Sequence, residues 1–362
     1  MIPELIHYDE TNHVLILSDL GPLPDLSRVF CELGGYTPGL GDTRKAPHPV
    51  PHSPRLGERL GDTEVLFFEM LGHKLGNFFA QLHSRRTRDL IFGASPNGFP
   101  SLPEMKVLVH EHAIKPLRAQ LLLFRSLITA DEAATLFSAI EADFLRDTAE
   151  QERCFVIGDC WTGTVLLDLE SRAEEIGIGV IDWEFANTSG RGPNGDISQF
   201  LAHLELFLIA AYSQGEEVAP GHISALKAIL KGFLTGYKNE QDKAQGSGLK
   251  DMIMRSAFLS HGAELINCAF WKIWACKDSE CLSCRQKNVE VSSASLDEKP
   301  NGSQSVAEEG SNPQCTLVTK MVSRGLSFLR CAVAQDPMEA SKILLREDPA
   351  YGKLPGLSDF FS

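Results

Sequence analysis

The stretch of sequence that decides the fold covers residues 155–167, FVIGDCWTGTVLL, and it is completed by residues 179–185, GVIDWEF. Each stretch carries one aspartate, Asp159 or Asp182, at a break between runs of strand-forming residues. The apolar runs at 165–169 and 176–181 flank a charged turn, which predicts a β-hairpin. Because a hairpin can deliver groups from both of its ends to one place, we expect the two carboxylates to face a common cleft.

Two carboxylates on tight loops suit phosphoryl transfer. This reaction needs one carboxylate to accept the proton of the attacking hydroxyl, and hard oxygen ligands to hold Mg²⁺ on the phosphates. Gly158 and Gly163 allow backbone turns that a side chain would hinder. Asp159 or Asp182 alone reads equally well as an ordinary loop carboxylate, so it is the pair at this spacing that favours a kinase-type site.

The two stretches resemble the signature of the aminoglycoside phosphotransferase, choline kinase and methylthioribose kinase family, a relative of the protein kinases. That signature reads His-Gly-Asp, four residues, then Asn, followed further on by Ile-Asp-Trp/Phe-Glu. Three other segments are also similar to the family: 76–83, which ends in Gln-Leu-His, 185–204 and 3–21. The resemblance covers most of the chain outside residues 35–61 and 277–314.

By position, the resemblance implies a role for each acidic residue. Asp159 would be the catalytic base, and Asp182 the main Mg²⁺ ligand with Glu184 close to it. Thr164 would stand where the family has a metal-binding Asn. Asp196 would brace the catalytic loop through hydrogen bonds to backbone amides, while its residue type alone also fits an N-cap of a helix starting at 197 or 198.

The resemblance also implies an ATP site and an acceptor. The hinge at Ser18 and Leu20 would offer backbone groups to the adenine, and apolar walls would come from Leu17, Leu166 and Ile181. The cofactors implied are ATP and Mg²⁺. The implied partner is a small molecule with a hydroxyl group, in a family whose acceptors range over aminoglycosides, choline-like alcohols, sugars and homoserine.

Three departures from the family pattern bear on activity. Ile157 replaces the His of the signature, and Thr164 replaces the Asn. We also expect residue 1 to fall inside the small lobe, without the Gly-rich hairpin, strand Lys and helix Glu that clamp the phosphates. Two hypotheses follow: a phosphotransferase dependent on ATP and magnesium, or a catalytically impaired, pseudokinase-like binding or scaffold protein.

The predicted fold is α+β and protein-kinase-like. Residues 1–21 would be a remnant of the small β lobe, a hairpin with its hinge, and residues 22–362 a mainly helical lobe carrying the catalytic hairpin. Residues 35–61 read as an irregular loop and 277–314 as a disordered insertion. We interpret His83 as a cationic cap at a helix C-terminus and Asp131 as an N-cap. Apolar periodicity predicts helices over 65–83, 108–124, 131–145, all of 198–276, 317–334 and 341–345.

Composition narrows the partners. Acidic residues outnumber basic ones by 48 to 34, for a net charge of -14, and Lys and Arg form no cluster. We therefore expect no binding to nucleic acid and no binding to an anionic membrane surface. Nine scattered cysteines and the lack of a signal-like N-terminus indicate a reduced, cytoplasmic protein. Two metal sites remain as minor alternatives: zinc at Cys281 and Cys284 with Cys276, and a pair formed by His48 and His52.

Overall fold

The computed structural model describes most of the predicted helical lobe. Described residues are 5–9, 14–17, 23–34, 60–94, 103–168, 177–215, 217–240, 247–270, 316–337 and 339–340. Most of the predicted irregular loop, the insertion at 277–314, and the helical predictions for 271–276 and 341–345 lie outside these residues.

Helices make up most of the described chain, with six short strands between them. In chain order the elements are β1 (Leu5–Asp9), β2 (Val14–Leu17), α1 (Leu26–Leu33), α2 (Asp62–Leu82), α3 (Arg85–Ala94), α4 (Pro103–Val109), the π-turn η1 (His110–Ile114), α5 (Lys115–Leu122), α6 (Ala130–Leu145), β3 (Arg153–Val156), the 3₁₀ turn η2 (Thr162–Thr164), β4 (Val165–Asp168), β5 (Gly177–Val180), the 3₁₀ turn η4 (Trp183–Phe185), β6 (Asn187–Arg191), the π-turn η5 (Pro193–Ile197), α7 (Ser198–Gln214), α8 (Pro220–Glu240), α9 (Ser247–Ala269) and α11 (Thr316–Val333).

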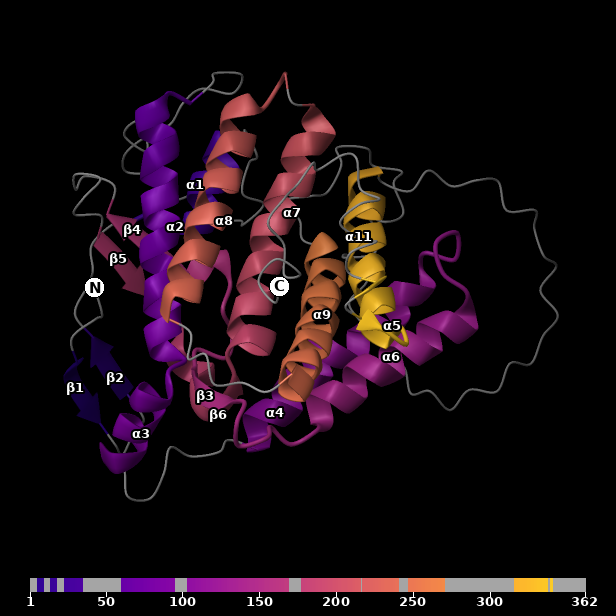
Figure 1. Cartoon of the computed structure of the whole chain (residues 1–362), viewed down its shortest axis with the longest axis horizontal. Helices are drawn as coiled ribbons and strands as arrows, with labels where there is room; N and C mark the ends of the chain where they lie inside the picture. Colours follow the sequence, from indigo (N-terminus) through magenta and orange to yellow (C-terminus); the bar gives the residue numbers. More distant parts are fainter. Residues whose placement is uncertain are drawn as a thin grey trace.

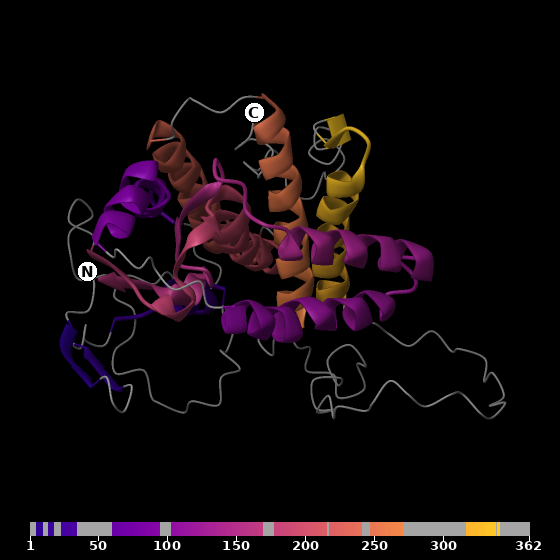
Figure 2. The ribbon, with the colours of Figure 1, turned by 90° about the horizontal axis from the view of Figure 1, so that it is seen from below.

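The long helices form the body of the molecule. Helix α2 packs along α8, α8 contacts α7, α7 contacts α9, and α9 packs along α11 (Figure 1). Figure 2 shows the α4–α5 segment and α6 running across α9 and α11; α5 and α6 contact α9, and α6 also contacts α11. The predicted α+β class with a dominant helical part is confirmed. None of the described helices is both long and apolar enough to cross a membrane.

Glycines let α2 and α8 approach until their backbones touch. A Cβ added at Gly72 would lie 2.1 Å from the carbonyl oxygen of Ile229, and one added at Gly232 would lie 2.0 Å from that of Glu69. Because no side chain fits at these distances, the crossing depends on glycine at both helices. Gly76 and Gly236 continue the same close contact one turn further on.

An aromatic cluster joins three helices beside this crossing. The rings of Phe79 on α2, Phe200 on α7 and Phe233 on α8 have centroids 5.2 to 5.9 Å apart, and all three side chains are fully buried. Full burial of a side chain of this size contributes about 1.5–3 kcal/mol. The cluster therefore holds the N-terminal part of α7 against α2 and α8, next to the loops that precede α7.

A buried charged cluster joins α7, α9 and α11. The Glu205 carboxylate on α7 accepts from Arg324 Nε of α11 and from His261 Nε2 of α9, at 2.6 Å each. His261 Nδ1 donates to the carbonyl of Ser198 at 3.0 Å. Burial alone would raise the pKa of Glu205, but Arg324 and His261 lower it to about 2, so this carboxylate stays ionised.

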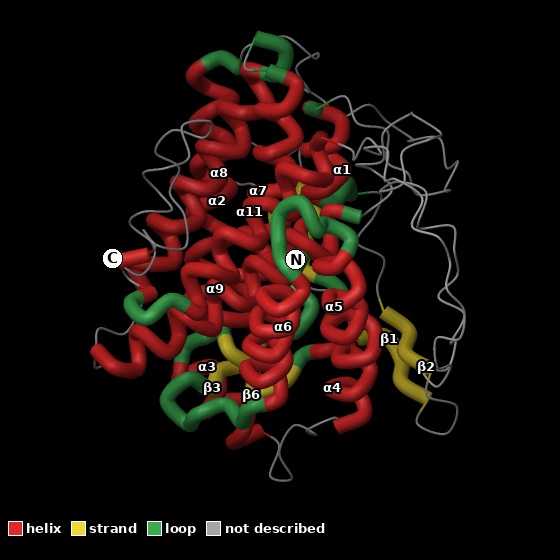
Figure 3. Tube along the Cα trace, turned by 90° about the vertical axis from the view of Figure 1, so that its right-hand side faces the viewer, coloured by secondary structure: helices red, strands yellow, loops and turns green. Residues whose placement is uncertain are grey.

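The strands form three antiparallel two-stranded sheets: β1 with β2, β3 with β6, and β4 with β5. The predicted hairpin is confirmed, with Val165 opposite Val180 and Asp168 opposite Gly177. The N-terminal hairpin is also present and lies at the edge of the molecule (Figure 3). The pairing of β3 with β6 is additional, and it places residue 156 beside residue 187.

Two predictions about helices were wrong in detail. Thr129, not Asp131, is the N-cap of α6, since its hydroxyl accepts from the backbone N–H of Glu132 at 3.2 Å. The helix predicted over 108–124 is interrupted by the wide π-turn η1. Pro116 follows at the start of α5 and lacks the N–H that a regular helix would use there, which accounts for the interruption.

Candidate active site

The loop that carries Asp159 is anchored by one buried carboxylate. Strand β3 ends at Val156, and the next two backbone N–H groups, of Ile157 and Gly158, donate to the two oxygens of Asp196 at 2.8 and 2.9 Å. These are the hydrogen bonds that the bracing role implies for Asp196. Its side chain does not cap α7, whose N-cap is Ile197 without a side-chain bond. The start of the loop is thus tied to the turn before α7.

His83 supports the same carboxylate. Its ring is buried, with Nε2 donating to Asp196 at 3.2 Å and Nδ1 accepting from the hydroxyl of Tyr237 at 2.9 Å. The interpretation of this histidine as a cationic helix cap was therefore incomplete. It ends α2 by position, but its side chain bonds Asp196, which lies 113 residues further along the chain. No local sequence pattern predicts such a contact.

Asp159 itself is partly buried and held by one amide. Gln199 Nε2 donates to its Oδ1 at 2.8 Å, and Gln199 Oε1 accepts from the backbone N–H of Cys160 at 2.9 Å. Burial raises the pKa of Asp159, against the lowering effect of the Gln199 hydrogen bond. A carboxylate with a raised pKa is a stronger proton acceptor, which is the property a general base requires.

Asp182 lies on the second loop in an unusual backbone conformation. The N–H of Ile181 donates to the carbonyl of Thr164 at 3.0 Å, which continues the β4–β5 pairing up to the loop. Asp182 then adopts φ 61° and ψ 54°, the left-handed region that residues other than glycine rarely enter. Asp182 is exposed, and partial desolvation of its carboxylate together with the charge of Glu184 raises its pKa. Strained residues of this kind cluster at functional sites.

The two loops adjoin each other. Gly158 has φ +88°, and a Cβ there would lie 2.3 Å from the carbonyl oxygen of Phe185, three residues after Asp182. The charge of Glu184 raises the pKa of both Asp159 and Asp182. The structure thus brings the two loops together, with Glu184 near enough for its charge to act on each aspartate.

For the other predicted site residues, the structure shows burial and local hydrogen bonds but does not test the predicted roles. Thr164 is fully buried and its hydroxyl donates to the carbonyl of Trp161 at 2.8 Å, so metal binding by Thr164 stays a prediction. Leu166 and Ile181 are both half-buried. The N–H of Leu167 donates to the carbonyl of Pro24 at 3.0 Å, so the segment after the predicted hinge runs beside β4.

Part of the predicted adenine site lies beyond what the structure describes. Leu17 ends β2, but its side chain is not described, and Ser18 and Leu20 fall outside the described residues.

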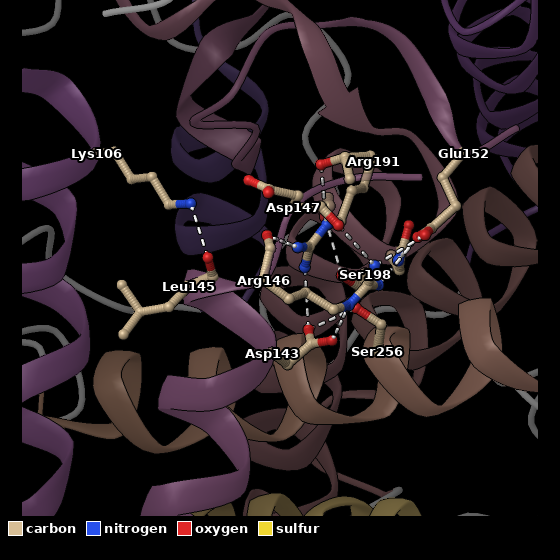
Figure 4. Close-up of polar contacts among 12 residues, drawn as sticks. Lys106, Asp143, Leu145, Arg146, Asp147, Glu152, Arg191, Ser198 and Ser256 are labelled. Atoms are coloured by element: carbon tan, nitrogen blue, oxygen red, sulfur yellow. Dashed lines mark hydrogen bonds and ion pairs between the residues drawn. The ribbon is translucent and has the colours of Figure 1, made fainter. Parts of the chain in front are cut away.

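A charged network holds the β3–β6 sheet against the helices (Figure 4). Arg146, at the end of α6, donates to both oxygens of Glu152 at 2.8 and 3.0 Å. Asp143 accepts from Arg191 of β6 at 3.1 Å and from Ser256 of α9 at 2.6 Å. The sheet that delivers the Asp159 loop is therefore fixed to α6 and α9 independently of Asp196.

Sequence reasoning missed a second polar cluster beside Asp159. His203, Glu264 and Cys268 lie together, and the charges of Glu264 and His203 both act on the pKa of Asp159. The i, i+4 spacing of Glu264 and Cys268 on one helix was the signal available in the sequence.

The arrangement offers hard oxygen donors on one loop and a carboxylate with raised pKa on the adjoining one. Carboxylates at Asp182 and Glu184 are the ligand type that Mg²⁺ prefers. Burial raises the pKa of Asp159, which is the direction that a general base needs. No protein-family model matches this chain, and no curated protein matches it.

Proposed function

We propose that this chain is an aminoglycoside-phosphotransferase-like protein that binds ATP with Mg²⁺ and transfers a phosphate to a hydroxyl of a small molecule. The observation that carries the proposal is the meeting of the Asp159 and Asp182 loops, with Glu184 acting on both carboxylates. The tie between Asp196 and the backbone at 157–158 adds support, since it is the bracing contact that the resemblance implies.

Each residue has a definite task in this proposal. Asp182, with Glu184 close by, holds Mg²⁺, which when bound neutralises charge on the phosphates. Asp159 orients the acceptor hydroxyl and takes its proton, and Gln199 fixes the direction of that carboxylate. Asp196 and His83 keep the loop from moving relative to α2 and α7.

The adenine would lie on the β4–β5 side of the two loops. Leu166 and Ile181 are partly exposed there and can contact an apolar ring. The backbone bridge between Asp25 and Leu166 brings the segment that follows the hinge to the same place. Ser18 and Leu20 complete this part of the proposal as backbone partners of the adenine.

A second candidate function is a pseudokinase-like binding or scaffold role. The buried Thr164, whose hydroxyl is already bonded to a backbone carbonyl, favours it, because a site with fewer metal ligands would bind nucleotide without efficient transfer. For both candidates we propose a cytoplasmic location. All five cysteines that the structure describes are free thiols, which fits a reducing compartment.

Thermal unfolding with and without Mg-ATP tests the proposal. At 100 times its Kd a ligand stabilises the folded state by about 2.7 kcal/mol, which raises the Tm by several degrees. We expect this rise in the wild type and in the control Asp147→Ala, an exposed aspartate outside the site, and its loss in Asp182→Ala. A wild type that does not respond to Mg-ATP contradicts nucleotide binding. An undiminished rise in Asp182→Ala contradicts the metal assignment.

Turnover separates the two candidate functions. In the phosphotransferase, slow release of phosphate from ATP to water should be measurable, and Asp159→Asn should lower it while leaving the Tm rise in place. A normal Tm rise with no ATP turnover by the wild type would favour the pseudokinase-like role.

A further inference from the structure

Three side chains of different chemistry meet between α7 and α9. His203 Nε2 lies 2.8 Å from Glu264 Oε1, Cys268 Sγ lies 3.1 Å from the same oxygen, and Cys268 Sγ lies 3.7 Å from His203 Nε2. His203 and Cys268 are buried, and the Glu264 side chain is 19 % exposed. Within the described part of the chain, this is the group of ligand-type residues that lies close enough to share one ion.

The separations are close to those of one face of a metal tetrahedron. Zinc bonds of about 2.0–2.1 Å to His and Glu and about 2.3 Å to Cys place tetrahedral ligand atoms about 3.3–3.6 Å apart. The observed distances of 2.8, 3.1 and 3.7 Å need only a small outward movement of the Glu264 carboxylate. Glu264 and Cys268 are four residues apart, so they project from the same face of α9.

Charge favours an ion here as well. Glu264 Oε1 lies between two hydrogen-bond donors, His203 Nε2 at 2.8 Å and Cys268 Sγ at 3.1 Å, which is a setting that suits a carboxylate. A divalent ion with one carboxylate, one thiolate and one neutral imidazole has no net charge, which removes most of the cost of burying it. Soft thiolate and imidazole ligands select zinc-like metals over Mg²⁺.

We propose that His203, Glu264 and Cys268 form a binding site for a zinc-type divalent metal ion, with the fourth position open to water or another ligand. Binding releases the thiol proton of Cys268 to solvent, and the ring proton of His203 moves from Nε2 to Nδ1. This site is separate from the magnesium–nucleotide site of the proposed function and does not depend on it.

The position of the site gives it a consequence for Asp159. Gln199 bonds both Asp159 and Glu264, so it links the metal ligands to that carboxylate. The ring of Trp161, from the Asp159 loop, lies 5.9 Å from the ring of His203. A bound ion would lock α7 to α9 and thereby fix the position of Gln199 and the Asp159 loop.

Cobalt titration of the full chain, without nucleotide, tests this site. Co²⁺ bound by a thiolate gives a charge-transfer absorption band, and we expect one equivalent to produce it. Cys268→Ser should abolish the band and lower Co²⁺ affinity at least tenfold, whereas Cys31→Ser, an equally buried thiol elsewhere, should retain both. His203→Gln should weaken binding while keeping the band at higher Co²⁺ concentration.

The outcomes that overturn the proposal are equally definite. They are no stoichiometric uptake by the wild type, or a band that Cys268→Ser leaves unchanged. A double substitution, Cys281→Ser with Cys284→Ser, checks the CxxC alternative: loss of the band in this variant assigns the metal to the CxxC segment and contradicts the site at Cys268. Circular dichroism of each variant confirms that it is folded, so a lost band reports a lost ligand.

Discussion

Replacing Asp196 with asparagine should destabilise the protein and loosen the Asp159 loop. The carboxylate accepts three hydrogen bonds: Oδ2 accepts from Ile157 N–H and from His83, and Oδ1 accepts from Gly158 N–H. Asparagine offers a single oxygen, so its NH₂ group must face at least one of these donors. The least costly orientation keeps Oδ2 as the oxygen and loses the bond to Gly158.

The structure sets the size of the effect. A hydrogen bond to a charged group contributes about 1.5–3 kcal/mol, and a buried donor left without a partner costs about 1–3 kcal/mol. Because the bond from the Gly158 N–H is only part-buried, we expect a loss of about 2–3 kcal/mol in the free energy of unfolding, mainly from the weakened charge-assisted bonds. Urea denaturation measures this loss, and an unchanged m-value shows that the folded state is still compact.

Hydrogen exchange shows where the destabilisation acts. The amides of Ile157 and Gly158 should exchange faster in Asp196→Asn than the overall loss of stability requires, because their acceptor has been weakened. The matched control is Asp89→Asn, whose carboxylate is 66 % exposed and should change stability by less than about 0.5 kcal/mol. Equal effects of the two substitutions, or unaltered exchange at 157 and 158, would refute the bracing role.

Three further predictions concern the helical body and are all read by urea denaturation. Gly232→Ala places a Cβ 2.0 Å from the Glu69 carbonyl oxygen and should lower the free energy of unfolding by about 1–3 kcal/mol. The control Gly93→Ala meets open space and should be neutral or stabilising by up to about 1 kcal/mol. Similar values for the two variants would contradict the close crossing of α2 and α8. Burial lowers the pKa of His222 to about 3, so below about pH 6.5 the unfolded state binds one more proton than the folded state, and stability falls as the pH is lowered. Between pH 7 and pH 5 the free energy of unfolding should drop by about 2 kcal/mol, and His222→Phe should remove this drop. The same slope of stability against pH in both proteins would contradict the prediction. Glu205→Gln leaves a buried guanidinium without its charged partner and should cost about 3–5 kcal/mol, so a loss under 1 kcal/mol would count against that ion pair.

Local patterns in the sequence predicted local structure well. The β4–β5 hairpin followed from two runs of strand formers around a charged turn, and the helices α2, α8 and α11 followed from apolar periodicity. The N-cap of α6 was misassigned because Thr129 and Asp131 are both favoured capping residues. Which of them caps depends on the residue at which the helix starts, and the sequence alone does not settle that to within two positions.

Contacts between distant segments were not predictable in the same way. The bond between His83 and Asp196 joins positions 113 residues apart, and nothing near His83 distinguishes it from a helix cap. The metal-type cluster likewise needs α7 beside α9 before Glu264 and His203 can meet. The crossing of α2 and α8 was predictable only in part. The glycine pairs four residues apart can be seen in the sequence of each helix, but only the tertiary structure shows that the two pairs face each other.

That the carboxylates of Asp159 and Asp182 face a common cleft was the central expectation, and it depended on the resemblance as well as on the hairpin. The structure shows that the two loops adjoin, and the shared cleft stays a prediction. The hairpin explains why residues 164 and 181 are neighbours, since the N–H of Ile181 donates to the carbonyl of Thr164. The approach of Gly158 to Phe185 requires a glycine with positive φ at position 158. The sequence shows the glycine there but does not predict that its φ is positive.

A crystal structure of the protein with Mg²⁺ and a non-hydrolysable ATP analogue tests the account most directly. We predict a magnesium ion about 2.1 Å from a carboxylate oxygen of Asp182, with the terminal phosphate of the analogue facing Asp159. Analogue and metal bound at a distance from both aspartates, or an Asp182 carboxylate that points away from the ion, would contradict it.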